Sequence, residues 1–485
     1  MKDVEPFGLI VLLAALGLLA AVLADRISSR ISVPAPALFL LAAGAVSQVW
    51  PELTSVPIGV DERIVTIALL LILFDGGIRI GWPAFRGSAG AIAWLGVGGT
   101  LVTAAAMSCA AYALLGVDWR LALLIGTALS PTDPAVVFSV LGRREIAGRS
   151  GTILEGESGA NDPVSIALMA ALLGSSVGGA DAIVEGVGSF ALQMTVGAAV
   201  GVLGGRLLGW QMQRLPLGNE ALYPVRALAM AALIYGAATV LHGSGFLAVF
   251  LAGICIGDLR APYKREVERF TSWTASFAEI LAFTVLGLTA PFGDLVNQGE
   301  LWLGAILAVL LIVVVRPVLV GLLSLPIRLP RNERAFVLFA GLKGAVPILL
   351  GTYILNSDVE GADRAYGIIV VVVLISVIVQ GGAVPWAARR LRVPMEIAEQ
   401  QPYGLGMRFQ GEPHGLQRHI VSKGSSADGR RIADLDLGED AWISLVSREG
   451  EMVQVRGSSL LRAGDEVLVL ADPDLDLGPV FGRRD

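Results

Sequence analysis

The chain has 485 residues, of which 54% are hydrophobic and only 16% are charged, and its formal net charge is −6. Soluble globular domains carry about a quarter of charged residues, so the composition excludes an ordinary soluble protein and indicates one that lies mostly in a membrane. The 2 cysteines and 3 histidines are scattered and predict neither a disulfide framework nor a metal cluster. We expect the lipid bilayer as the main surroundings, with no cofactor and no nucleic-acid partner.

Apolar runs recur along the first four-fifths of the chain, each long enough to cross a hydrocarbon core of about 30 Å as a helix. They are continuous and lack the alternation of barrel strands, so an all-α polytopic fold is predicted rather than a β-barrel. We predict about 13 transmembrane helices, at residues 6–24, 33–50, 63–80, 88–115, 119–141, 152–174, 183–209, 221–241, 244–258, 272–290, 301–325, 334–355 and 365–388.

Positive charges in the loops fix the expected orientation. Lys and Arg are about five times as frequent in one set of alternating loops as in the other, and the sparse set holds only Lys2, Arg63, Arg120 and Arg364. The first run lacks a basic leader and a cleavage site, so it is predicted to be a retained helix rather than a signal peptide. We therefore expect the N-terminus outside and the C-terminus in the cytoplasm of a multi-pass protein of the cell membrane.

The composition becomes polar after Arg392. We predict a transmembrane domain at 1–392, a linker at 393–412 and a cytoplasmic domain at 413–485. Within the last range, the alternating runs ISLVS, MVQVR and EVLVL are separated by the turn signals REGE and RAGDE, with one short helical stretch near Arg430 to Leu437. This pattern predicts a small α+β domain.

Ionisable side chains inside the predicted spans need a reason, because each costs about 2.5–3.5 kcal/mol on insertion scales. They are Asp75, Asp133, Glu155, Glu157, Asp162, Glu279, Arg316 and Lys343. Glu279 and Arg316 lie in long apolar runs, so we expect them to pair or cap between helices rather than to contact an ion.

Two of the predicted spans contain helix breakers beside a charge. In LSPTDPAVV, Pro131 and Pro134 flank Asp133, and in FAGLKGAVPILL, Gly341, Gly344 and Pro347 surround Lys343. Interrupted helices free backbone groups at bilayer depth, which can coordinate an ion. The breaks fall in the fifth and twelfth spans, as expected of inverted repeats that pair spans one to six with spans eight to thirteen.

The sixth span, ILEGESGANDPVSIALMAALL, carries a third polar group. Ser158 and Asp162 are four residues apart and share one helix face, as do Glu157 and Asn161. Pro163 follows Asp162 and bends or interrupts the helix there. One carboxylate and one hydroxyl are therefore predicted to point the same way.

Taken together, SPTDPAVV, EGESGANDPVS, LFDGGIRI and GLKGAVPILL resemble segments of the monovalent cation:proton antiporter family, in its NhaP branch. The phrase LLRAGDEVLVLAD and the runs before it resemble the TrkA-C domain, which is typical of a subgroup described as potassium:proton antiporters. The resemblance implies a homodimer, and a tail that senses a small-molecule ligand or mediates dimer contacts.

The resemblance also implies roles for individual residues. Asp162 would exchange the proton for the cation, Ser158 and Thr132 would coordinate the metal ion, and Asp133 and Asn161 would shape the site. Glu157 would pair with Lys343, where the family generally has Arg, and Asp75 would assist the cation path.

Competition of a proton and a cation for one buried carboxylate predicts obligatory exchange when only loaded states cross. The neutral Asn161 leaves one exchanging carboxylate, so the simplest stoichiometry is electroneutral, one H⁺ per K⁺ or Na⁺, with K⁺ favoured by the tail. A Na⁺-selective antiporter is the first alternative. A more remote alternative is a TrkA-C-regulated potassium channel, but no filter repeat is visible. An intramembrane aspartyl protease could use Asp133 and Asp162 as a dyad, yet the prolines, Asn161 and the thirteen spans fit a transporter better. A sodium-coupled solute symporter would need a larger organic pocket, and ion flux without an organic substrate would exclude it.

Overall fold

The structure is a computed structural model of the chain, which divides into two compact units, Met1–Ala398 and Glu399–Asp485. The predicted first span, 6–24, lies outside the residues that the structure describes. Those residues are 34–49, 58–141, 144–146, 148–174, 180–290, 300–397, 416–435, 437, 441–448, 451–472, 475 and 477–482.

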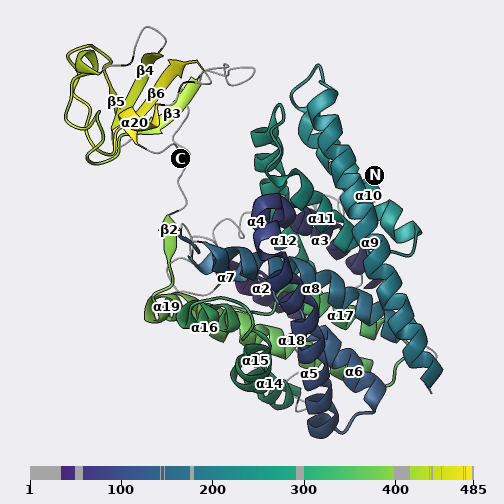
Figure 1. Ribbon diagram of the computed structural model, residues 1–485. Helices are drawn as coiled ribbons and strands as arrows, with labels where there is room; N and C mark the ends of the chain where they lie inside the picture. The colour runs from purple at the N-terminus through teal and green to yellow at the C-terminus, as the bar shows by residue number, and fades with distance from the viewer. Residues whose placement is uncertain are drawn as a thin grey trace. The chain divides into compact units, whose positions relative to one another are not determined.

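The first unit is built of helices (Figure 1). Its first part contains α2 (Ala35–Val49), α3 (Ile58–Ile80), α4 (Trp82–Ala93), the π-helical η2 (Trp94–Gly99), α5 (Thr100–Leu115), α6 (Trp119–Ala128), α7 (Ala135–Leu141), α8 (Arg149–Gly174) and α9 (Ala180–Arg214). Its second part contains α10 (Leu222–Val240), α11 (Gly245–Gly257), α12 (Lys264–Thr289), α14 (Glu300–Leu310), the π-helical η3 (Leu311–Val320), α15 (Gly321–Leu323), α16 (Arg331–Phe339), α17 (Ala345–Leu355), α18 (Ala362–Ile375), the π-helical η4 (Ser376–Gln380) and α19 (Gly381–Leu391).

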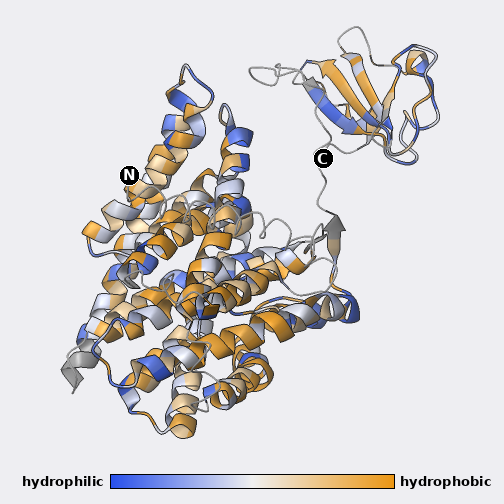
Figure 2. Cartoon of the chain, turned by 180° about the vertical axis from the view of Figure 1, so that it is seen from behind, coloured by the Kyte–Doolittle hydropathy of each residue, from blue (hydrophilic) through white to orange (hydrophobic). Residues whose placement is uncertain are grey.

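Helical segments overlap each predicted span from 33–50 onward, which confirms the helical membrane architecture. Among the described residues, 6 helices are long and apolar enough to cross a membrane, while others are shorter or interrupted, so the total of 13 stays a prediction. Apolar residues predominate along these helices (Figure 2). Many point outward, such as Val240 and Trp302, which are 79% and 74% exposed, as expected of side chains that contact lipid.

Local sequence signals explain several helix ends. The Asp118 carboxylate caps α6 by accepting hydrogen bonds from the backbone N–H groups of Arg120 and Leu121. Gly116, with φ of 65°, ends α5 in the left-handed conformation. Ser244 caps α11 in the same way as Asp118 caps α6. Capped, short turns keep successive helices adjacent and antiparallel.

Both predicted breaks are present. The chain leaves helical geometry between α6 and α7 and again between α16 and α17, at the two segments that carry Asp133 and Lys343. The relation of these segments by an inverted repeat stays a prediction. A two-stranded antiparallel ribbon also belongs to this unit, in which β1 (Arg144–Ile146) pairs with β2 (Met395–Ile397). β2 falls within the range that the sequence predicts as linker.

The second unit contains a four-stranded antiparallel sheet in the order β3-β6-β4-β5. Its strands are β3 (Leu416–Ile420), β4 (Ala441–Arg448), β5 (Glu451–Val453) and β6 (Glu466–Ala471), and it ends in the short α20 (Gly478–Phe481). Val446, Val467, Val469 and Phe481 lie in its buried core. The helical stretch expected near Arg430 to Leu437 is a single 3₁₀ turn, Ile432–Asp434.

Candidate functional site

The two interrupted helices meet at their breaks. The Asp133 backbone N–H donates to the Leu342 carbonyl at 2.9 Å. In the other direction, Lys343 Nζ donates to the Pro131 carbonyl at 2.8 Å and to the Ser130 carbonyl at 3.1 Å. The prolines and glycines that unwind each segment thus leave backbone groups whose partners lie on the other segment.

Each break carries a charged side chain whose sign is opposite to the partial charge of the helix end that it faces. The Asp133 carboxylate accepts a hydrogen bond from the Ala135 N–H at 2.8 Å, at the start of α7. The ammonium group of Lys343, which is 1% exposed, lies at carbonyls that follow the end of α6. Helix N-termini favour anions and C-termini favour cations, so both charges are stabilised where they lie.

Two glycines of the second break leave room for charged side chains from other helices. A Cβ added at Gly344 would lie 1.9 Å from Asp133 Oδ2, and one added at Gly341 would lie 2.1 Å from the Arg316 guanidinium. Any side chain at either position would displace a charged group. The glycines beside Lys343 therefore provide room as well as breaking the helix, a role that the sequence analysis did not anticipate.

α8 joins the first break through Thr132. The Asn161 amide donates to Thr132 Oγ1 at 2.7 Å, and its carbonyl oxygen accepts from the Thr132 N–H at 3.3 Å. Ser158 Oγ donates to the Thr132 carbonyl at 2.6 Å. The structure thus brings together Thr132, Ser158 and Asn161, three of the residues predicted to form the site.

Asp162 differs from its neighbours. It is 8% exposed and lies next to Asn161 on α8, and no described residue donates a hydrogen bond to its carboxylate. Two other acids of this region, the half-buried Asp133 and the buried Glu157, each have a hydrogen-bond partner. A buried carboxylate without a protein donor can take up a proton or a cation, because either one compensates its lost hydration.

Glu157 pairs with a residue other than the predicted one. Arg316 Nη1, on η3, donates to Glu157 Oε1 at 2.8 Å, and both side chains are at most 5% exposed. Arg316 Nε also donates to the Leu338 carbonyl at 3.2 Å. The predicted pair of Glu157 and Lys343 is therefore wrong, because Lys343 is engaged with the carbonyls of the first break. The expected pairing role of Arg316 between helices is present in the structure.

Two predicted residues stand outside this bonded group. Asp75, on α3, pairs with Arg79 of the same helix at 2.7 Å, and Arg79 also donates to Ser272 on α12 at 2.9 Å. Glu279, on α12, was expected to pair or cap between helices, but its Oε1 is buried and no described residue gives it a hydrogen bond.

Further polar residues position the second break. The Lys343 N–H donates to Ser376 Oγ at 3.0 Å, and Ser376 in turn donates to Gln380 at 2.9 Å. Gln380 donates to the Phe339 carbonyl, at the end of α16. Ser376 and Gln380 are the first and last residues of the π-helical η4. The sequence analysis missed both, and the one signal that could have marked them as functional is that they are polar residues within an apolar run.

Two interrupted helices cross in this helical membrane unit, beside a buried carboxylate to which no described residue donates a hydrogen bond. This is the architecture of a secondary transporter. The family described as "Sodium/hydrogen exchanger, transmembrane" matches residues 11–390, and the TrkA-C domain matches residues 416–475. The chain belongs to the sodium/hydrogen exchanger family and carries a TrkA-C domain. Members of this family are membrane-embedded cation/proton antiporters, which are transporters rather than enzymes.

Curated relatives share both parts of the chain. The K(+)/H(+) antiporter NhaP of Alkalimonas amylolytica is 32% identical over 96% of this chain and 82% of its own length. The K(+)/H(+) antiporter NhaP2 of Shewanella sp. (strain MR-4) is 29% identical over the same shares. The Na(+)/H(+) antiporter NhaH of Halobacillus dabanensis is 28% identical over 66% of this chain and 81% of its own length.

A solved structure shares the fold of the helical unit. The sodium proton antiporter MjNhaP1 from Methanocaldococcus jannaschii at pH 8 superposes with a TM-score of 0.66, at 21% identity, over 77% of this chain and 99% of MjNhaP1.

Proposed function

We propose that the chain exchanges one monovalent cation for one H⁺ across the cytoplasmic membrane, without net movement of charge. K⁺ is the favoured substrate and Na⁺ the alternative. Two relatives that match over 96% of the chain, tail included, are named K(+)/H(+) antiporters, whereas the relative named a Na(+)/H(+) antiporter matches only 66% of it.

One observation carries this proposal: no described residue donates a hydrogen bond to the buried carboxylate of Asp162, whereas the nearby Asp133 and Glu157 each have a partner. A proton and a cation then compete for the same carboxylate. Ser158 Oγ, the Thr132 carbonyl and the Thr132 hydroxyl are the oxygens we assign to the cation, while Asp133 and Asn161 hold the backbone around them. Asp75 serves the path of the cation towards the site.

The hydrogen bonds at the two breaks support alternating access as the transport mechanism. Backbone and charged groups tie the two interrupted helices to each other, and Asn161 ties them to α8. We infer that these elements move together against the remaining helices and expose Asp162 to one side at a time. Crossing requires a bound proton or cation, because an empty carboxylate would carry a bare charge through the protein. Each pH unit then drives about a tenfold cation gradient, about 1.4 kcal/mol.

We extend the proposal to the organisation of the whole chain. The exchanger domain is 1–392, the linker 393–412 and the regulatory domain 413–485, which binds a small-molecule regulator and faces the cytoplasm. The N-terminus lies outside, and the protein forms a homodimer. The excess of Lys and Arg in alternate loops supports the orientation, and the resemblance to the antiporter family supports the dimer.

The test is cation-dependent dequenching of a pH dye in proteoliposomes, with K⁺, Na⁺, Li⁺ and Rb⁺ offered separately. We expect the wild type to respond, Asp162→Asn to lose the response, and Asp363→Asn, which changes an exposed aspartate at the start of α18, to keep it. An imposed membrane potential should leave the wild-type rate unchanged.

Each remaining outcome would contradict part of the proposal. Equal responses from the wild type and Asp162→Asn would make Asp162 structural. A rate that follows the membrane potential would exclude electroneutral exchange, and cation flux without proton flux would point to a channel. The ion series decides between K⁺ and Na⁺.

A further inference from the structure

A second polar feature lies away from Asp162, on the surface of the helical unit. A pocket of about 620 Å³ opens between α4 and the segment that joins α15 to α16. Its lining includes Gly90, Ala91 and Trp94 from α4 and η2, Ile327 from the joining segment, and the two arginines Arg149 and Arg328. The volume lies within the range of about 300–1,000 Å³ that is usual for ligand sites.

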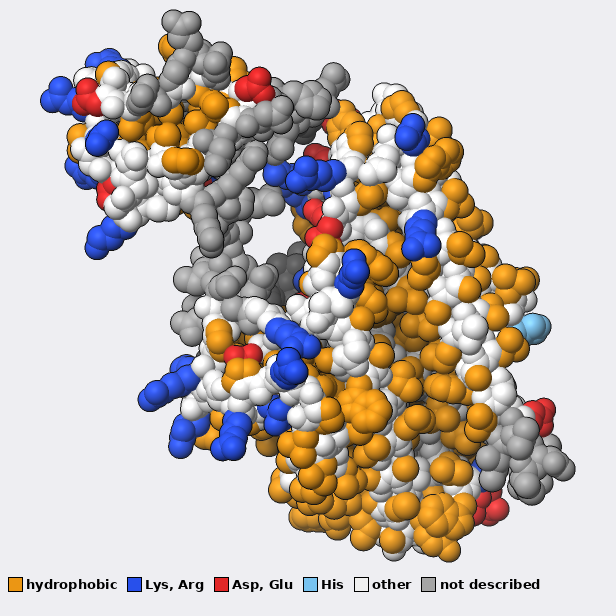
Figure 3. Space-filling view, in the orientation of Figure 1, with side chains coloured by type: hydrophobic (Ala, Val, Ile, Leu, Met, Phe, Trp, Pro, Cys, Tyr) orange, Lys and Arg blue, Asp and Glu red, His pale blue; other side chains and the backbone are white. Residues whose placement is uncertain are grey.

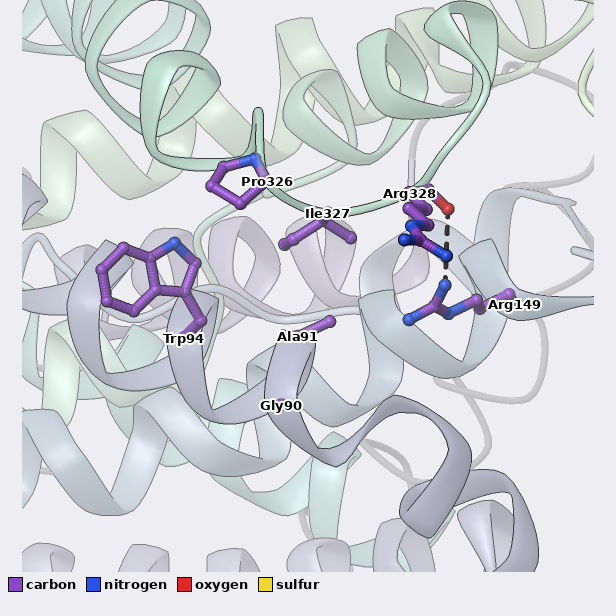
Figure 4. A pocket seen from close by; sticks show the side chains of 7 residues that line it. All are labelled: Gly90, Ala91, Trp94, Arg149, Pro326, Ile327 and Arg328. Carbon is purple, nitrogen blue, oxygen red and sulfur yellow. Dashed lines mark hydrogen bonds between the residues drawn. The ribbon is translucent and has the colours of Figure 1, made fainter.

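The pocket has a charged end and an apolar end. Figure 4 shows the side chains of Arg149 and Arg328 side by side at one end, with Trp94 at the other. Arg149 Nη1 donates to the Arg328 carbonyl at 3.4 Å, which brings the two positive residues together. Both are exposed, and neither has an acidic partner among the described residues. Two adjacent guanidiniums without a counter-charge attract an anion.

The apolar end of the pocket lies at the depth where lipid headgroups meet the hydrocarbon core. Gly90 and Ala91 fall at the start of the apolar run predicted at 88–115, so the pocket is at the edge of the bilayer. Trp94 is 49% exposed, and its indole N–H is fixed by the Leu323 carbonyl at 2.8 Å, which leaves the ring available to a neighbour. Tryptophan is the residue that membrane proteins place at the level of lipid headgroups.

Other arginines mark the same side of the bilayer. The positive-inside pattern assigns Arg149 and Arg328 to the cytoplasmic loops, together with Arg389 and Arg390 at the end of α19. Lys and Arg side chains gather on part of the face of the helical unit seen in Figure 3, beside large apolar areas. The cytoplasmic leaflet is the one that carries anionic lipids, and basic pockets between membrane helices on that side bind their headgroups.

We propose that this pocket binds the headgroup of an anionic phospholipid, with the phosphate between Arg149 and Arg328 and the glycerol and upper acyl chain against Gly90, Ala91 and Trp94. The pocket is close to the elements of the site. Trp94 bonds to α15, which directly follows the π-helical segment that holds Arg316, and Ile92 of α4 packs against Gly156, next to Glu157. A bound lipid would therefore stabilise the packing of α4 and α15 around the Glu157–Arg316 pair.

The experiment uses the full-length protein, purified in detergent and depleted of lipid, with phosphatidylglycerol or phosphatidylcholine added back. Native mass spectrometry measures retained lipid, and thermal unfolding measures the stabilisation. We expect the wild type to retain phosphatidylglycerol and to unfold at a higher temperature with it than with phosphatidylcholine. Arg149→Gln and Arg328→Gln should each weaken retention about fivefold, and the double variant about thirtyfold.

Two matched variants make the result specific. Arg389→Gln/Arg390→Gln removes the same charge from exposed arginines outside the pocket and should retain lipid as the wild type does. Gly90→Leu keeps both guanidiniums but fills the pocket, since an added Cβ at Gly90 has no neighbour within 4 Å, and it should lose retention.

Three outcomes would overturn the proposal. Equal loss in the Arg389→Gln/Arg390→Gln control would mean that only general surface charge attracts the lipid. Stabilisation of the wild type by inorganic phosphate to the same extent as by phosphatidylglycerol would make the pocket a site for a soluble anion. Equal retention of the two lipids by the wild type would mean that the arginines select nothing. None of these readouts depends on cation exchange, so they leave the proposed function untouched.

Discussion

Glu157 and Asp162 lie on the same helix, little more than one turn apart, and their surroundings are opposite. Glu157 is 2% exposed and bonded to the guanidinium of Arg316, whereas Asp162 is 8% exposed and has no described donor. A buried ion pair is costly to break, because the partner left behind keeps its charge without hydration. The comparison separates an acid that holds the helices together from an acid that is free to change its ligand.

The largest effect should come from breaking the paired acid. Arg316→Met leaves Glu157 without a counter-charge, so the free energy of unfolding should fall by about 3–5 kcal/mol. Asp162→Asn removes no hydrogen bond from a described residue and should change the free energy of unfolding by less than about 1 kcal/mol. Thermal unfolding of the two purified variants in detergent compares them directly.

The double variant Glu157→Gln/Arg316→Met is the control for that measurement. It removes both charges and should regain most of the stability lost in Arg316→Met, because no unpaired charge is left. If Arg316→Met and Asp162→Asn unfold at the same temperature, the distinction between the two acids fails.

A smaller effect should separate the two glycines of the second break. Gly344→Ala drives a methyl group into the Asp133 carboxylate at the first break, while Gly341→Ala drives one into the Arg316 guanidinium, which is bonded to Glu157 and the Leu338 carbonyl. Each should cost about 1–3 kcal/mol. Gly344→Ala should reduce exchange more than Gly341→Ala, because Asp133 shapes the proposed cation site. Dye dequenching and thermal unfolding measure the two effects separately.

Gly236→Ala on α10 is the matched control, since an added Cβ there has no neighbour within 4 Å. It should leave exchange unchanged and should raise stability slightly, by up to about 1 kcal/mol, because alanine favours the helix. If Gly341→Ala and Gly344→Ala reduce exchange equally, the proposal that Asp133, but not Arg316, shapes the cation site is wrong.

The smallest effect concerns a paired acid of the second unit. Burial raises the pKa of Asp465, but hydrogen bonds from Arg448 and from the Arg462 N–H outweigh burial and bring the pKa below its ordinary value. The pair therefore stabilises the second unit above about pH 4 and is lost as the pH falls further. Asp465→Asn should cost about 1 kcal/mol at neutral pH, since Arg448 is partly exposed and solvent screens it.

Protease protection of the tail in the full-length protein, followed as the pH is lowered, checks this prediction. The wild type should lose protection in acid, and Asp465→Asn should start lower and depend less on pH. An Asp465→Asn variant with the acid sensitivity of the wild type would show that another group controls the unfolding of the domain.

The sequence predicted the interrupted helices because their causes are local: prolines at 131 and 134 and glycines at 341 and 344 act on their own backbone. The family resemblance implied that Ser158 and Asn161 belong to one site with Thr132, whereas the spacing alone indicated only which residues share a helix face. The partner that the family resemblance implied for Glu157 was wrong, and the actual partner, Arg316, is 159 residues away in the sequence. Arg316 was expected to pair between helices, but it lies in a π-helical stretch with Pro317, and no local spacing in the sequence indicates which acid it contacts.

The order of synthesis gives the crossing of the two breaks another consequence. Lys343 lies 212 residues after Pro131, the carbonyl to which it donates. At about 5–20 residues per second, the ribosome needs about 10–40 s to reach it. During that interval Asp133 and Glu157 enter the bilayer before Lys343 and Arg316 exist, each at the usual cost of a charge in lipid. Until the second half of the chain is synthesised, the early helices or the insertion machinery must therefore keep Asp133 and Glu157 out of contact with lipid.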